Sequence, residues 1–89
     1  RSKGDTIMGK EVKFKNRDRF VQLGITIAKL RKEQGLSQDK LAELADISRS
    51  YLSVIEAPGS ACDFDLEVLY DIADALNIRA AELIDASEK

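Results

Sequence analysis

The chain has 89 residues and a formal net charge of −2, and its 44% hydrophobic and 34% charged residues are typical of one small soluble helical domain. No apolar run approaches the roughly 20 residues of a membrane-spanning helix, and the polar first residues do not resemble a signal peptide, so we expect a soluble cytoplasmic protein. With no histidine and a single cysteine, Cys62, the composition argues against an enzyme, a metal site or a bound cofactor.

The charges are distributed unevenly along the chain. Residues 1–35 hold ten lysines and arginines against four acidic residues, a net charge of +6, whereas residues 36–89 hold four against twelve, a net charge of −8. Such a split predicts a protein with one basic end or one basic face. Residues 1–16 lack helical periodicity, and we interpret them as a basic N-terminal arm with a short extended piece over residues 11–15.

Three helices are predicted in the next forty or so residues. The first runs from residues 16–18 to Gly35, a residue that readily takes the left-handed conformation at a helix end. Its apolar residues share one face: Leu23, Ile27 and Leu30. Ser37 is expected to cap a second helix, and Ser48 is expected to cap a third helix that ends near Ala57.

Two further helices follow the break at residues 58–60. Asp65 is expected to cap a fourth helix with a clear apolar stripe, and Asn77 to take the left-handed turn that ends it. A last helix over about residues 79–84 offers Leu83 and Ile84 as apolar side chains. Five helices without a strand of consequence predict an all-α fold.

The segment Leu36–Glu56 holds two short helices joined by very few residues. Helices of about two turns bury little surface alone, so their packing must be fixed by the turn and by close contact. The inward positions are apolar or small: Leu41, Ala42, Ala45, Ile47, Leu52 and Ile55. The outer face of the second of these helices is left small and polar.

This segment resembles the helix-turn-helix of the Xre/Cro phage-repressor family, and the resemblance extends over about residues 20–84. The string GLSQ is similar to the turn after the family's first helix, and LEVLYDIADALNIRAAELI to its last two helices. The resemblance implies a compact five-helix, lambda-repressor-like domain over residues 17–86, followed by a tail at 87–89. It also implies a sequence-specific DNA-binding transcriptional regulator, a repressor that binds a pseudo-palindromic operator in double-stranded DNA as a homodimer.

The resemblance further assigns roles to individual residues. Base readout is expected from the outer face of the third helix, namely Arg49, Ser50, Ser53 and Val54. Of these, Arg49 has the fork of donors that fits O6 and N7 of guanine. Phosphate contacts are expected from the helix starts and the arm, namely Ser37, Gln38, Ser48, Tyr51, Lys13, Lys15 and Arg17. Arg31 and Glu56 match an architectural ion pair that orients the third helix and that, if exposed, would contribute about 0 to 1 kcal/mol.

These assignments have ordinary structural alternatives. Arg49 taken alone is a solvated arginine, Gln38 is a helix-start residue, Tyr51 is partly packed, and the basic residues of the arm serve solubility. Three apolar residues are candidates for the dimer interface or, equally, for closing a small core: Phe14, Leu83 and Ile84.

The chain also departs from the family's pattern. Asp46 replaces the usual turn glycine, residues 57–59 lack the basic side chains that commonly bind phosphates, and Arg79 stands where a serine or threonine cap is usual. Residues 37–56 themselves carry a net charge of −2. These features favour an alternative hypothesis, a protein-interaction or antitoxin-like module with weak or no base readout that binds a protein partner through its acidic C-terminal half.

Overall fold

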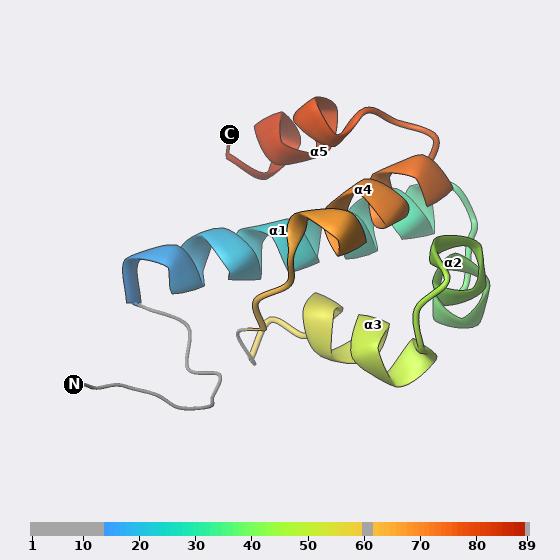
Figure 1. The fold of residues 1–89 in the computed structure, drawn as a ribbon, viewed down its shortest axis with the longest axis horizontal. Helices are drawn as coiled ribbons and strands as arrows, with labels where there is room; N and C mark the ends of the chain where they lie inside the picture. The colour runs from blue at the N-terminus through green and yellow to red at the C-terminus, as the bar shows by residue number, and fades with distance from the viewer. Residues whose placement is uncertain (1–13, 60–61, 89) are drawn as a thin grey trace.

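The computed structural model describes residues 14–59 and 62–88. Its longest element is the helix α1 (Phe14–Glu33). Four shorter helices follow: α2 (Gln38–Ala45), α3 (Arg49–Glu56), α4 (Leu66–Ala75) and α5 (Ala80–Ser87). Helix α1 contacts α3 and α5, α2 contacts α3 and α4, and α4 contacts α5 (Figure 1). The five predicted helices are confirmed, and the described residues include no strand.

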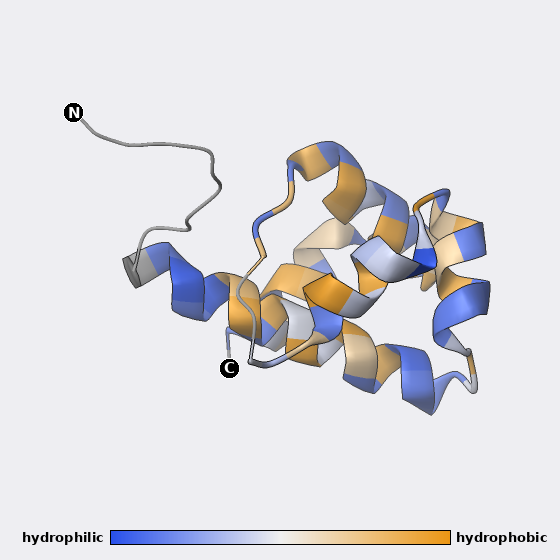
Figure 2. Ribbon diagram, turned by 90° about the horizontal axis from the view of Figure 1, so that it is seen from below, coloured by the Kyte–Doolittle hydropathy of each residue, from blue (hydrophilic) through white to orange (hydrophobic). Residues whose placement is uncertain are grey.

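The core lies between the helices and takes at least one large aliphatic side chain from each of them. The fully buried ones are Ile27, Leu41, Leu52, Ile72, Leu76 and Leu83. Figure 2 shows that every helix carries both hydrophobic and hydrophilic residues, as amphipathic helices do. Each fully buried leucine or isoleucine contributes roughly 1.5 to 3 kcal/mol of transfer free energy, so this small set is the main source of stability.

The apolar residues of α5 were predicted either to close the core or to form a dimer interface, and their burial distinguishes these two roles. Leu83 is 0% exposed and belongs to the core, so it has no surface to offer a second protomer. Ile84 is half-buried and packs against the same core. The side chain of Phe14 lies outside the described residues.

Three of the helix ends are built in the same way. One or two residues after the helix, the chain takes a left-handed conformation: Gly35 (φ 74°), Asp46 (φ 59°) and Asn77 (φ 61°). The next backbone N–H donates to a carbonyl five residues earlier at 3.0 Å, as in the Schellman motif. The residue that carries this N–H folds back onto the core: Leu36, Ile47 and Ile78. The left-handed turns predicted at Gly35 and Asn77 are confirmed.

The helix starts are capped by side chains at α2, α3 and α4. The hydroxyls of Ser37 and Ser48 accept from the backbone N–H groups three residues later at 3.0 Å, and a carboxylate oxygen of Asp65 does so at 3.1 Å. Helix α5 begins differently, because the Glu82 carboxylate accepts from the backbone N–H of Arg79 at 2.9 Å. Glu82 therefore takes part in the start of α5, where the family's usual serine or threonine is missing.

Helices α1 and α5 extend beyond their predicted ends. Helix α1 begins at Phe14, so Lys15 and Arg17 lie on a helix and not in an arm. Helix α5 continues to Ser87, whose buried hydroxyl donates to the carbonyl of Ile84 at 2.7 Å. Ser87 is therefore part of the packed domain. The rest of the predicted arm, residues 1–13, lies outside the described residues.

Helix α1 approaches α3 most closely at Gly24. A Cβ atom added there would collide with the carbonyl oxygen of Ile55, which belongs to the backbone of α3 and cannot rotate away. Glycine is therefore required at this position for contact, not for backbone conformation. Its effect is to let the C-terminal end of α3 lie against α1.

We predict that Gly24→Ala destabilises the domain by about 1 to 3 kcal/mol, because the collision costs more than the roughly 1 kcal/mol that alanine gains in helix propensity. Urea unfolding measures the difference. Gly59→Ala is the matched control, since a Cβ atom there meets nothing within 4 Å and should change the free energy of unfolding by no more than about 1 kcal/mol. Equal stabilities of the two variants would contradict the close approach.

Candidate nucleic-acid interface

The position of α3 is fixed by a buried ion pair with α1. Arg31 donates from Nε to Oε2 of Glu56 at 2.9 Å and from Nη2 to Oε1 at 3.0 Å. The two side chains are only 10% and 4% exposed. The structure thus brings the two residues together. Because the pair is buried, the contribution of about 0 to 1 kcal/mol given above for an exposed pair does not apply. Removing one partner of a buried pair leaves an uncompensated charge and typically costs 3 to 5 kcal/mol.

Two further hydrogen bonds extend this ion pair to the start of α2. Arg31 also donates from Nη1 to the carbonyl of Leu36 at 2.8 Å, and Gln38 donates from Nε2 to Oε1 of Glu56 at 2.9 Å. The end of α1, the turn after it, the start of α2 and the end of α3 are therefore held by one network. The amide nitrogen of Gln38 carries two hydrogens and this contact uses one, so a phosphate contact is chemically compatible with it.

The two faces of α3 differ sharply in exposure. Leu52 and Ile55 are buried in the core, with 0% and 2% of their surface exposed. The residues predicted to contact bases are all exposed: Arg49, Ser50, Ser53 and Val54. Helix α3 therefore presents a small, largely polar face to the outside, along one edge of the molecule (Figure 1).

Both cations of the segment 37–56 are paired with acids on the surface. Arg49 Nε lies 3.3 Å from Asp39 Oδ1, and Lys40 Nζ lies 3.6 Å from Glu43 Oε1. The Lys40–Glu43 pair follows from helical spacing, but residues 39 and 49 meet only because α2 and α3 cross. Sequence reasoning did not identify the Asp39–Arg49 pair.

The starts of α2 and α3 expose groups that suit an anion. Helix N-termini carry partial positive charge and unpaired N–H groups, which favour phosphate. Ser37 and Ser48 lie at these two starts, and both are exposed. Each hydroxyl accepts one backbone N–H and keeps its own hydrogen as a donor.

Tyr51, on the first turn of α3, is half-buried and packs against the core. Burial is the main cause that raises the pKa of its phenol above the ordinary value of 10.0, and Cys62, Asp65 and Asp63 add to the effect. The phenol is therefore neutral and able to donate at physiological pH. The acidic residues after α3 thus lie near Tyr51.

Of the basic residues predicted to bind phosphates from the arm, Arg17 is not brought together with Arg49. Arg17 is exposed near the start of α1, at the opposite end of the molecule from α2 (Figure 1). Lys13 and the side chain of Lys15 lie outside the described residues.

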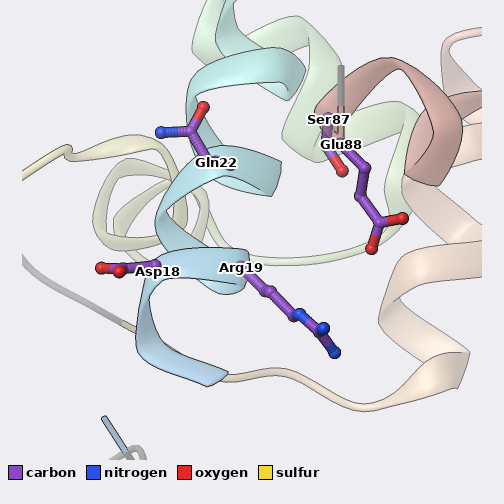
Figure 3. A pocket seen from close by; sticks show the side chains of 5 residues that line it. All are labelled: Asp18, Arg19, Gln22, Ser87 and Glu88. Atoms are coloured by element: carbon purple, nitrogen blue, oxygen red, sulfur yellow. The ribbon is translucent and has the colours of Figure 1, made fainter. Parts of the chain in front are cut away.

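One hollow in the described residues lies away from α3. A polar hollow of about 420 Å³ lies between the start of α1 and the end of α5 (Figure 3), and it is lined by Asp18, Arg19, Gln22, Ser87 and Glu88. Within residues 14–59 and 62–88 there is no group of side chains that could hold a metal ion. None of the helices in these residues has the length and the apolar composition of a transmembrane span.

Comparisons with known proteins also identify a helix-turn-helix domain in this chain. The family model described as a helix-turn-helix domain matches residues 24–88. The restriction-modification controller protein C.AhdI from Aeromonas hydrophila is 34% identical, over 72% of this chain and 94% of its own, with a TM-score of 0.67.

Two other regulators are similar. The clp gene regulator ClgR from Corynebacterium glutamicum is 27% identical, over 80% of this chain and 72% of its own, with a TM-score of 0.70. SinR, a master regulator for biofilm formation solved in complex with DNA, is 33% identical, over 71% of this chain and 98% of its own, with a TM-score of 0.64. No match was found among curated proteins.

We predict that Arg31→Ala and Glu56→Ala each destabilise the domain by about 3 to 5 kcal/mol, and that the double variant loses clearly less than the sum. A double-mutant cycle by urea unfolding measures the coupling. The exposed pair Lys40 and Glu43 is the control, for which the same cycle should give about 0 to 1 kcal/mol. Additive losses at Arg31 and Glu56 would show that the buried contact does not form in solution.

The raised pKa of Tyr51 predicts a loss of stability in alkali. Above pH 10 the unfolded chain releases this proton while the folded protein retains it, so the free energy of unfolding falls as pH rises through the folded pKa. Unfolding of the native protein and of Tyr51→Phe, measured from about pH 8 to about pH 11, should show a steeper decline for the native protein. Parallel declines would show that folding does not raise the pKa of this phenol.

Proposed function

The chain belongs to the helix-turn-helix domain family of the Xre and lambda-repressor type, and we propose that it is a sequence-specific DNA-binding transcriptional regulator. In this proposal it represses transcription by occupying an operator. The relatives support this assignment, because C.AhdI is a controller protein, ClgR is a gene regulator and SinR was solved in complex with DNA. Fold alone does not establish function, so the argument rests on the exposed face of α3.

The observation that carries the proposal is the contrast between the two faces of α3. Its inner side is buried through Leu52 and Ile55, and its end is held by Glu56, so the outer side has one orientation. The major groove is about 12 Å wide and admits a helix. Arg49 then binds O6 and N7 of a guanine, and Val54 packs on a thymine methyl group. Ser50 and Ser53 complete the face that meets the base edges.

Phosphates on either side of this groove are bound by the starts of α2 and α3. The groups in this role are Ser37, Gln38, Ser48 and Tyr51. Lys15 and Arg17 lie on α1 near its N-terminal end, away from α2, and in this proposal they and Lys13 bind phosphates on a flanking stretch of the duplex. Each neutralised phosphate releases counterions, so affinity falls with salt.

We propose a homodimer as the binding species. One helix contacts only a few base pairs, and two protomers related by a dyad place their α3 helices about 34 Å apart, in successive major grooves. A pseudo-palindromic operator follows from this symmetry. Because Leu83 is in the core, the interface must use other residues, and the half-buried Ile84 is the remaining candidate on α5.

A second candidate function is a protein-interaction module with an antitoxin-like role. The observation in its favour is the surface of α4, where Leu66 and Tyr70 are 63% and 54% exposed and the charged residues are all acidic. The salt dependence of binding separates the two functions. A DNA-binding protein loses about 0.9 log units of affinity per log unit of salt for each phosphate neutralised, whereas a pure interaction module forms no specific DNA complex.

We predict that Arg49→Ala weakens binding to the preferred operator by about 1 to 3 kcal/mol and relaxes preference at one base position. Selection of bound duplexes from a random pool, followed by titration, measures both effects. Val54→Ala should relax preference at a different position, where thymine is favoured.

Arg79→Ala is the matched control, because this exposed arginine lies at the start of α5, away from α3 (Figure 1). It should leave the selected sequence unchanged. If Arg49→Ala and Val54→Ala also leave it unchanged, the outer face of α3 does not contact the bases.

A further inference from the structure

Asp39 and Arg49 form an ion pair that contributes nothing to the core. Asp39 is the second residue of α2 and Arg49 the first residue of α3, and Arg49 Nε lies 3.3 Å from Asp39 Oδ1. Their side chains are 78% and 63% exposed. Exposed ion pairs contribute little to stability, so folding does not explain this contact.

We propose that Asp39 is a positioning residue that sets the base specificity of Arg49. The carboxylate holds one side of the guanidinium and leaves its other edge directed at the groove. This inference rests on the proposed function, because it concerns how the same exposed face distinguishes one base pair from another.

The geometry of arginine supports this role. The guanidinium is planar and carries five N–H donors in a fixed fork. With Asp39 beside Nε, the two terminal nitrogens remain, and they match the two acceptors of guanine, O6 and N7. A long side chain held from a neighbouring helix also has fewer conformations to lose on binding. Arg49 is therefore partly ordered before it meets the base.

The charge of the pair favours discrimination in a second way. Asp39 neutralises Arg49, and Glu43 does the same for Lys40, so neither cation of segment 37–56 adds much attraction for phosphates in general. Non-specific binding depends on that attraction, whereas the guanine contact depends on the fork of donors. The pair thus lowers affinity for the wrong duplex more than for the right one.

Glu43 provides a matched control for Asp39. Both are exposed acids of α2, but Glu43 pairs with Lys40 and not with Arg49. Asp39→Asn and Glu43→Gln each remove one negative charge from the same helix while conserving shape. A general electrostatic effect must therefore appear in both variants, and a positioning effect only in Asp39→Asn.

The test compares binding of the native protein and these variants to two duplexes. One is the operator selected by the native protein, and the other has the base pair recognised by Arg49 replaced. Both variants should bind the altered duplex more tightly than the native protein does. Only Asp39→Asn should discriminate less between the duplexes, by roughly five- to tenfold. This loss is a part of the discrimination that a bidentate contact between arginine and guanine provides. In the Arg49→Ala background, Asp39→Asn should change discrimination no further.

Two results would overturn the inference while leaving the proposed function intact. One is equal discrimination by Asp39→Asn and Glu43→Gln, with Arg49→Ala still relaxing the selected sequence. The other comes from NMR of the unbound protein. The resonance of the Arg49 Nε–H group should shift in Asp39→Asn and not in Glu43→Gln. If it is unchanged in Asp39→Asn, the ion pair is absent. A native protein that selects no sequence would instead remove the proposed function, and this inference with it.

Discussion

The buried contact between Arg31 and Glu56 determines where α3 lies. A charge taken out of water is stable only when it is fully paired, and Glu56 meets this condition through Arg31 and Gln38 together. Gly24, on the same helix as Arg31, allows the backbone of α3 to approach closely enough for these contacts. The outward orientation of the polar face is therefore a consequence of contacts made on the opposite side and at the end of the same helix.

The charges on the outside of α2 and α3 serve a different purpose. The buried pair holds a helix in place, whereas the exposed pairs of Asp39 with Arg49 and of Glu43 with Lys40 leave the surface nearly neutral. At this surface, a DNA phosphate would be attracted mainly by helix N-termini and hydroxyls, which act over short distances. In the proposed function, such a surface binds DNA of any sequence weakly, and its affinity for the operator depends on the fit between Arg49 and its base pair.

Sequence alone was sufficient for features set by near neighbours and insufficient for contacts between helices. The cap at Ser48 and the left-handed turns at Gly35 and Asn77 follow from residues within one helical turn. The pairing of Asp39 with Arg49 depends on how α2 and α3 cross, which no local pattern encodes. The start of α1 was also missed, because its first turn lacks an acidic residue that would mark a helix start.

Methylation interference on the selected operator tests most directly whether the outer face of α3 lies in the major groove. A methyl group on guanine N7 occupies the major groove, whereas one on adenine N3 occupies the minor groove. Methylation of N7 at one guanine in each half-site should weaken binding of the native protein, and Arg49→Ala should be insensitive to it. Interference confined to adenine N3, or the same pattern for both proteins, would contradict the proposed orientation of α3 on DNA.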